Sequence, residues 1–94
     1  TIKADRAHEI GLVDKVVPAE RLLEEAKSLA SKLTRMSSIA LRAAKTAIRK
    51  GLNGSLKEGL HIEQDLFCML FGTEDQKEGM AAFLEKRKPV FKGK

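Results

Sequence analysis

Residues 72–89, GTEDQKEGMAAFLEKRKP, carry the clearest structural signal in this 94-residue sequence. Thr73 followed by Gln76 fits a capping box, in which the two side chains satisfy free backbone N–H groups of the first helical turn. The two acids between them complement the positive end of the helix dipole. Pro89 cannot continue a helix, so the pattern predicts a helix that ends at or just before Lys88.

The net charge of the chain is concentrated in the tail that follows this helix. Residues 86–94 contain no acid and five basic residues, namely Lys86, Arg87, Lys88, Lys92 and Lys94. The other 85 residues contain 13 basic and 13 acidic side chains, so the formal charge of +5 comes from the tail. A balanced body with a cationic end predicts one localised anionic ligand rather than a broad nucleic-acid surface.

The composition, 43% apolar and 33% charged, is that of one small globular domain. The longest apolar run, residues 66–71, is far too short to span a bilayer, and no membrane association is expected. Cys68 lies inside that run and is the single cysteine, so a disulfide framework is excluded and a reducing compartment is expected. We interpret Cys68 as an inert thiol in the core.

The first 18 residues predict two short elements. Residues 4–10 are compatible with a short helix that stops at Gly11, a residue suited to the left-handed position after a helix. Residues 12–17 are apolar and β-branched apart from a polar centre, and Pro18 closes the segment. This pattern predicts a short strand or an extended connector.

Three longer helices are predicted between residue 19 and the capped helix. Over residues 21–33 the apolar positions fall on one helical stripe: Leu22, Leu23, Ala26, Leu29, Ala30 and Leu33. The next helix begins near Ser37, a good N-cap, and runs to Lys50. The third opens with a capping box of Ser55 and Glu58 and runs to Phe71. The fold class expected is therefore mainly α, with about four helices and one short strand.

The second half of the helix at 56–71 is apolar on nearly all sides. Six consecutive apolar residues, 66–71, extend over more than a full turn. Such a helix must be covered from more than one direction. The other helices of this chain can cover about one side, so we expect the rest to contact a partner subunit or a domain absent from the chain.

Candidates for catalysis are few. His8 and His61 lie in different segments, with no metal-ligand spacing around them, and no glycine-rich phosphate loop is present. Glu63 stands out as a carboxylate between Leu60 and Leu66 on the apolar helix. We interpret it as paired to a basic side chain rather than as a catalytic acid. The residues alone therefore define no active site, and no metal site is predicted.

The charged end of the capped helix offers a binding hypothesis. Phe83, Lys86 and Arg87 fall at positions i, i+3 and i+4, so a ring and a cation can face one ligand. An aromatic face for a base and a cation for a phosphate suit a nucleotide-bearing molecule. The alternative is that Phe83 belongs to the core and the tail is a solvated, fraying end.

Three segments together resemble the crotonase (enoyl-CoA hydratase/isomerase) family. They are GLVDKVVP at 11–18, SIALRAAKTAI at 38–48 and TEDQKEGMAAFLEKR at 73–87, and the last is close to the form found in short-chain enoyl-CoA hydratases. Ser38 departs from the family, in which a proline is common at that place. The resemblance extends over essentially the whole chain, and its last motif is the most specific.

The resemblance implies that the chain is the C-terminal third of an enoyl-CoA hydratase, a lyase that adds water to trans-2-enoyl-CoA thioesters in fatty-acid β-oxidation. The two catalytic glutamates and the oxyanion-hole N–H groups of the family lie upstream of the matched region. No catalytic residue is therefore expected here, and the isolated chain is expected to be inactive. The absence of an initiator methionine agrees with a processed or excised piece.

The resemblance also divides the chain and assigns its binding residues. Residues 1–18 would end the crotonase core as a short helix and strand, and residues 19–94 would form the helical trimerisation region of the α/β fold. Phe83 would pack by the adenine of CoA, and Lys86 would meet the phosphate-bearing ribose. The implied partners are acyl-CoA and copies of the same chain, as a trimer or a dimer of trimers.

No cofactor is implied beyond the CoA thioester as substrate, and the expected location is the bacterial cytoplasm or the mitochondrial matrix. Within the family, an acyl-CoA isomerase or another lyase remains an alternative, because the discriminating carboxylates are not in this chain. Outside it, the alternatives are a small helical module that binds RNA or another anion through the basic tail, and a purely structural oligomerisation domain.

Overall fold

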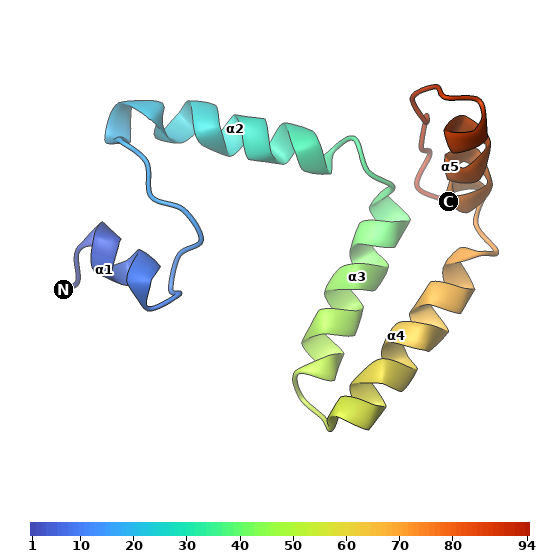
Figure 1. The fold of residues 1–94 in the computed structure, drawn as a ribbon, viewed down its shortest axis with the longest axis horizontal. Helices are drawn as coiled ribbons and strands as arrows, with labels where there is room; N and C mark the ends of the chain where they lie inside the picture. Colours follow the sequence, from blue (N-terminus) through green and yellow to red (C-terminus); the bar gives the residue numbers. More distant parts are fainter. The chain divides into compact units, whose positions relative to one another are not determined.

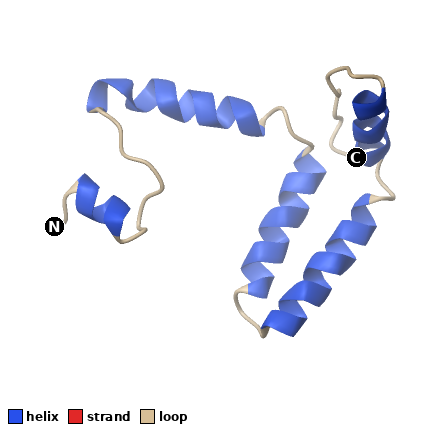
Figure 2. Cartoon of the chain, in the orientation of Figure 1, coloured by secondary structure: helices blue, strands red, loops and turns tan.

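The computed structural model describes residues 1–94, and all of its regular structure is helical (Figures 1 and 2). The elements are α1 (Ala4–Glu9), a 3-10 turn (Ala19–Arg21), α2 (Leu22–Leu33), α3 (Ser38–Gly51), α4 (Leu56–Leu70) and α5 (Glu74–Leu84). The mainly α fold class is confirmed. None of these helices combines the length and apolar character that a membrane crossing requires.

The chain divides into two compact units, residues 1–32 and residues 33–94. In the first unit, Gly11 adopts φ +74°, and the N–H groups of Leu12 and Val13 both donate to the carbonyl of Ala7. This turn folds residues 12 and 13 back onto α1. Of the two alternatives predicted for residues 12–17, the short strand is wrong and the segment is an irregular connector, because a strand needs a second strand to pair with and the structure contains none.

The helix predicted at 21–33 is confirmed as α2, which a 3-10 turn introduces. Glu25 pairs with Lys15 at 2.6 Å and with Arg21 at 3.0 Å. The bond from Lys15, followed by its charge, lowers the pKa of the Glu25 carboxyl. The apolar side of α2 remains uncovered, with four leucines exposed to between 47% and 66%: Leu22, Leu23, Leu29 and Leu33.

Helices α3 and α4 form an antiparallel hairpin in the second unit (Figure 1). Ser37 caps α3 by accepting a hydrogen bond from the Ala40 N–H, and Ser55 and Glu58 form both bonds of the predicted capping box. The two helices approach most closely at a pair of glycines. A Cβ built on Gly59 would lie 3.3 Å from the Cα of Gly51, so neither position has room to spare for a large side chain.

Helix α5 begins as predicted but ends at Leu84, four residues before Lys88. The Thr73 hydroxyl oxygen accepts from the Gln76 N–H, but the Thr73 N–H donates to the Leu70 carbonyl and not to the Gln76 side chain, so the box is not reciprocal. At the other end the Arg87 N–H donates to Ala82 O and the Lys86 N–H to Phe83 O, with Lys86 at φ +55°. These are the two bonds of a Schellman motif. The left-handed turn at Lys86 therefore ends α5, and the helix does not extend as far as Pro89.

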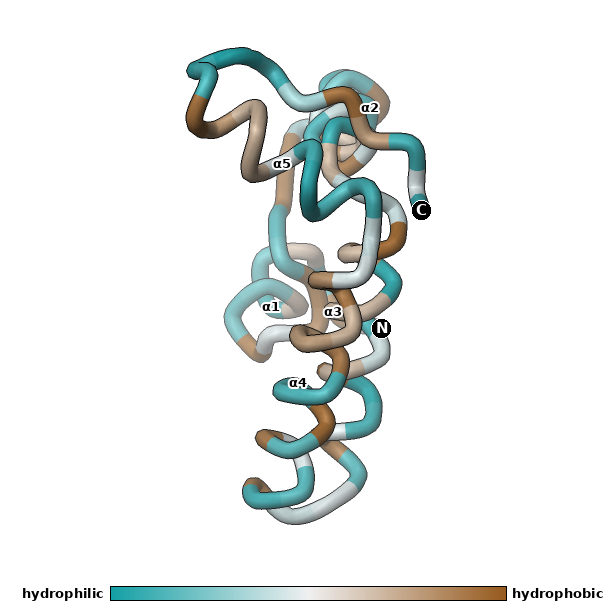
Figure 3. Tube along the Cα trace, turned by 90° about the vertical axis from the view of Figure 1, so that its right-hand side faces the viewer, coloured by the Kyte–Doolittle hydropathy of each residue, from teal (hydrophilic) through white to brown (hydrophobic).

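The core that this arrangement encloses is small. The buried apolar residues are Ala7, Ala43 and Ala82, and the buried polar ones are Ser37 and Asp75. Hydropathy along the trace shows apolar residues recurring through α3 and α4 (Figure 3). Most of these larger side chains stay exposed, including Leu56 at 80%, Leu60 at 53% and Phe67 at 61%. The apolar surface that the sequence expects to be covered is therefore open in this chain.

Candidate functional site

The two residues for which the family resemblance predicts a CoA contact lie at the C-terminal end of α5. Phe83 is the second-last residue of the helix and is 79% exposed, so it is not a core residue. Lys86 lies two residues beyond the helix end. The prediction that both residues lie on one continuous helix is wrong, because the Schellman turn separates them. They remain neighbours through the hydrogen bond of 3.3 Å between Lys86 N–H and the Phe83 carbonyl.

Arg87 does not join this pair. Its guanidinium reaches back to α5 and binds both carboxylate oxygens of Glu78, at 2.6 and 3.0 Å, and it also contacts Glu85. Glu78 in addition accepts a hydrogen bond from the Val90 N–H at 2.8 Å. The bond from Arg87, followed by that from Val90, lowers the pKa of the Glu78 carboxyl to about 2. Arg87 is therefore committed to holding the tail, which leaves Lys86 as the adjacent unpaired cation.

Asp75 is the second anchor of the tail, a role that the sequence did not predict. Its carboxylate is buried and accepts the Ser37 hydroxyl at 2.5 Å and the backbone N–H groups of Lys92 and Gly93 at 2.7 and 3.0 Å. The bond from Ser37, and then those from the tail, lower the pKa of the Asp75 carboxyl against the opposing effect of burial. Its position in the first turn had suggested only a helix-dipole role.

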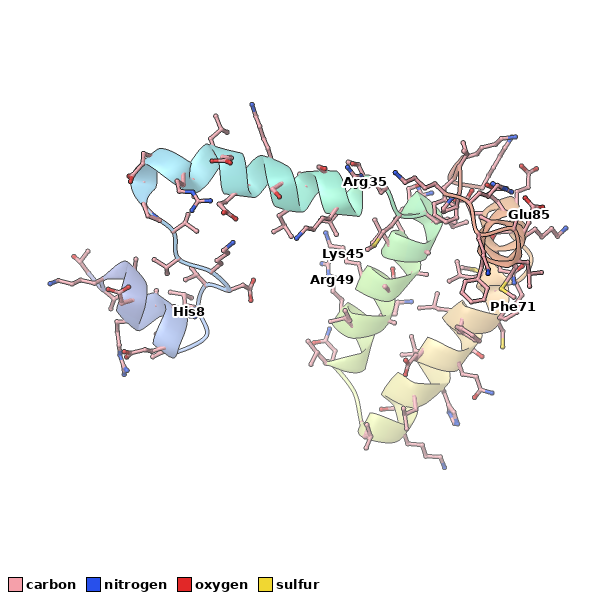
Figure 4. All side chains as sticks on the ribbon, turned by 45° about the horizontal axis from the view of Figure 1, so that its top comes forward. His8, Arg35, Lys45, Arg49, Phe71 and Glu85 are labelled. Atoms are coloured by element: carbon pink, nitrogen blue, oxygen red, sulfur yellow. The ribbon has the colours of Figure 1, made fainter.

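A groove of about 610 Å³ runs between α3 and α4. Most of its wall is apolar: Ala40, Ala43, Ala44, Ala47, Ile48, Leu52, Leu56, Leu60, Leu66, Phe67 and Leu70. Phe67 stacks edge-to-face on Phe71, with ring centres 5.2 Å apart. Figure 4 shows Phe71 at the end of α4, beside the start of α5.

Two predictions about α4 are wrong in this structure. Glu63 lies on the groove wall but is exposed and makes no ion pair, because no basic residue of α3 points across the groove. Figure 4 shows Lys45 and Arg49 on the side of α3 away from α4. Cys68 is exposed instead of buried, because α3 covers only one side of α4.

The histidines do not form a site. His8 contacts the Val13 carbonyl at 3.2 Å within the first unit, and His61 lies exposed on α4 (His8 is labelled in Figure 4). No three side chains among His, Cys, Asp and Glu gather closely enough to hold a metal ion. The structure thus presents three separate features: a Phe83–Lys86 edge, a tail bound by two carboxylates and an open apolar groove.

Known proteins share this whole segment. The sequence profile described as enoyl-CoA hydratase/isomerase matches residues 1–94. A probable enoyl-CoA hydratase of Mycobacterium bovis is 50% identical over 91 residues, which is 97% of this chain and 35% of that protein. The 2,3-dehydroadipyl-CoA hydratase of Escherichia coli is 48% identical over 94 residues, which is 100% of this chain and 37% of that protein.

The fold is shared as well. A crystal structure of an enoyl-CoA hydratase/isomerase from Mycobacterium paratuberculosis superposes with a TM-score of 0.94 at 36% identity, and the match covers 99% of this chain and 37% of that one. The chain therefore spans about a third of the length of the proteins that it matches.

Proposed function

Because the chain belongs to the enoyl-CoA hydratase/isomerase family, we propose that it is the C-terminal helical part of an enoyl-CoA hydratase. In this proposal the complete enzyme adds water across the double bond of trans-2-enoyl-CoA thioesters in fatty-acid breakdown, in the bacterial cytoplasm or the mitochondrial matrix. The segment itself contributes subunit association, closure of the acyl site and one contact to CoA. The groups that activate water and stabilise the thioester enolate belong to the remainder of the enzyme, and no cofactor beyond the substrate takes part.

The uncovered apolar groove between α3 and α4 is the observation that carries this proposal. Its volume of about 610 Å³ and the exposure of Leu56, Leu60 and Phe67 leave a large apolar surface in water. Larger apolar side chains are mostly buried in a monomeric soluble protein, whereas 21 of them are exposed here and only three alanines are buried. Burial against the core of the enzyme or against a neighbouring subunit removes that cost, at about 25 cal/mol for each Å² covered.

The CoA contact rests on the edge formed by Phe83 and Lys86. The exposed ring offers a face for the adenine, and the adjacent ammonium offers a charge for the ribose phosphate. Neither residue has another partner in the chain that would compete for it. The structure alters the earlier hypothesis in one respect: the cation approaches from a left-handed turn after the helix rather than from the helix itself.

The test is an assay of crotonyl-CoA hydration with the 94-residue chain and with the complete enzyme. We expect turnover only with the complete enzyme, since the chain contains no acid–base pair at a common site. Appreciable turnover by the chain alone would contradict the proposal. Turnover of a positional isomer of the double bond by the complete enzyme, in place of hydration, would assign it to the isomerases of the same family.

Sedimentation of the chain tests its role in association. We expect concentration-dependent self-association, because the α3–α4 groove and the leucines of α2 are open. A well-folded chain that remains monomeric at high concentration would contradict the subunit-contact role while leaving the assignment of the catalytic groups untouched.

A further inference from the structure

A second hollow lies between the segment that precedes α3 and the C-terminal tail. It has a volume of about 690 Å³ and lies wholly within the second unit. One wall comes from the segment before and at the start of α3, and the other from the tail: Thr34, Arg35, Met36 and Ser38, and Lys88, Pro89, Phe91, Lys92 and Gly93. Phe83 and Lys86 do not line it, so it is distinct from the edge assigned to CoA.

The walls of this hollow are fixed by the buried carboxylate of Asp75. It accepts the Ser37 hydroxyl from one wall and the N–H groups of Lys92 and Gly93 from the other, and its own N–H donates to the Lys94 carbonyl at 2.9 Å. Gly93, at φ +78°, lies so close to α3 that a Cβ there would be 2.5 Å from the Ser38 hydroxyl. The hollow is therefore held open by a defined network, not by a loose terminus.

Three cations line this hollow, and no acid does. Arg35, Lys88 and Lys92 all contribute to the walls, and none of them forms an ion pair. Most of the 18 basic side chains are unpaired, since only Arg6, Lys15, Arg21 and Arg87 have a carboxylate within 4.0 Å. What distinguishes these three cations is that they line one hollow.

The acids of α5 offset only part of this positive charge. Asp75 does not line the hollow, but its carboxylate keeps its negative charge while it accepts hydrogen bonds from the walls, so it offsets one of the three cations. Glu78 is held by Arg87 and the Val90 N–H, although the charge of Lys92 also reaches it. No acid lines the concave surface itself, and the net positive charge that remains around it attracts an anion.

The remaining lining groups favour phosphate over other anions. Ser38 is the first residue of α3, so its hydroxyl stands at the positive end of a helix of 14 residues. A phosphate presents several acceptor oxygens that guanidinium, ammonium and hydroxyl groups can share, and Arg35 supplies a planar pair of donors. Phe91 offers an apolar wall beside them.

We propose that this hollow is a binding site for a phosphate-bearing small molecule, with Arg35, Lys88 and Lys92 as its charged contacts. The phosphate could belong to the acyl-CoA itself or to a separate phosphorylated compound, and both sources present the same chemistry to these side chains. The proposal does not depend on the hydratase activity, so its test is independent of that assay.

The test is a titration of the ¹⁵N-labelled 94-residue chain with inorganic pyrophosphate, followed by the amide signals of Ser38 and Gly93. We expect both signals to shift in a saturable manner. Arg35→Gln and Lys92→Gln should each weaken binding by about fivefold to tenfold, because each removes one charge-assisted contact. Lys45→Gln and Arg49→Gln are the matched controls, since both cations lie on α3 but line neither wall, and they should leave the affinity unchanged within about twofold.

A second titration with CoA identifies the source of the phosphate. Shifts at Gly93 together with Phe83 would assign the hollow to the phosphates of CoA, whereas pyrophosphate shifts that CoA does not reproduce would assign it to a separate compound. Absence of saturable shifts at Gly93 overturns the proposal, and so does equal weakening by the control substitutions. All four substituted side chains are exposed, so the fold should survive, and unchanged amide signals of Ala82 and Ala43 will verify this.

Discussion

The hydroxyl of Ser37 donates a hydrogen bond of 2.5 Å to the carboxylate of Asp75, which lies 38 positions later in the sequence. These two residues are the only buried polar residues of the chain, and the bond joins the N-cap of α3 to the first turn of α5. Because Asp75 also holds the backbone of Lys92 and Gly93, one carboxylate joins two helices and the tail. This network takes the place that a cluster of large apolar side chains occupies in most domains.

Replacing Asp75 by Asn should release the tail. The amide keeps the shape of the carboxylate but loses its charge and one of its acceptor oxygens, so it cannot hold Ser37, Lys92 and Gly93 together. We expect hydrogen exchange at the Lys92 and Gly93 amides to become roughly tenfold faster or more. Asp65→Asn is the matched control, because Asp65 is exposed on α4 and forms no ion pair. Equal exchange in both variants would show that Asp75 does not anchor the tail.

Acid should detach the tail over a defined range of pH. The pKa of the Glu78 carboxyl is lowered from 4.5 to about 2, first by its bond from Arg87. A group whose pKa is lower in the folded state stabilises the fold above its unfolded pKa, and that contribution is lost as the pH falls through the folded value.

We therefore expect the Val90 amide to stay protected at neutral pH and to lose protection progressively between pH 4.5 and about 2. The pKa of Asp75 is lowered as well, so its anchor should weaken in the same direction. In Glu78→Gln, the Val90 amide should already exchange faster at neutral pH, and its exchange should change little further on acidification. Protection of the Val90 amide that increases on acidification would contradict the stabilising role of the ionised Glu78 carboxylate.

Gly93→Ala should loosen the tail through two effects that can be separated. An alanine at φ +78° is strained by about 1 kcal/mol, and its Cβ would also press on the Ser38 hydroxyl at 2.5 Å. The added substitution Ser38→Ala should recover part of the loss in tail docking, measured from the amide shift of Lys92. Gly11→Ala is the control for strain alone, because Gly11 has φ +74° and open space around it. A loss that Ser38→Ala does not reduce would exclude the steric contribution.

The glycine pair of the α3–α4 hairpin should respond unequally to alanine. A Cβ on Gly51 meets the Cα of Gly59 at an ordinary 3.6 Å, whereas a Cβ on Gly59 meets the Cα of Gly51 at 3.3 Å. Alanine is better than glycine within a helix by about 0.5–1 kcal/mol. We expect Gly51→Ala to raise the midpoint of thermal unfolding followed by circular dichroism, and Gly59→Ala to raise it less or to lower it. A larger gain for Gly59→Ala would contradict the close approach.

Phe83→Ala in the complete enzyme should raise the KM for enoyl-CoA with little change in kcat. If Phe83 makes the proposed contact to the adenine, its loss corresponds to about a threefold to tenfold rise in KM. Met80→Ala is the matched control, because Met80 is 54% exposed on the same helix and is not assigned to CoA. A rise in KM that is equal in both variants, or a loss confined to kcat, would contradict the assigned contact.

The sequence predicted best those features that depend on neighbouring residues. The Ser37 cap and the Ser55–Glu58 box were both foreseen and are confirmed, because the groups that make them lie within three residues of each other. The strand at 12–17 was wrong for the opposite reason. A β-branched pattern shows that a segment is suited to a sheet, but a strand forms only when another segment lies beside it and shares its hydrogen bonds.

The end of α5 and the role of Asp75 show the same limit. The left-handed position that ends a helix is usually occupied by glycine, so the lysine at position 86 did not indicate a turn. Pro89 was the only residue in this segment that predicted the end of the helix. The anchoring of the tail joins Asp75 to residues 17 and 18 positions away. No local pattern reports such a contact, although the acids at 75 and 78, one helical turn apart and facing a basic tail, would have been a usable hint.

The small core has a calorimetric consequence. Only three alanines are buried among the apolar residues, so unfolding of the chain by itself would expose little new apolar surface. The heat-capacity change of unfolding follows the apolar area exposed, and the slope of a denaturant titration follows the total area. Both should be small for a chain of 94 residues, and the transition should be broad. Covering the α3–α4 groove, by the rest of the enzyme or by another subunit, would bury more apolar surface and should therefore make the unfolding transition sharper.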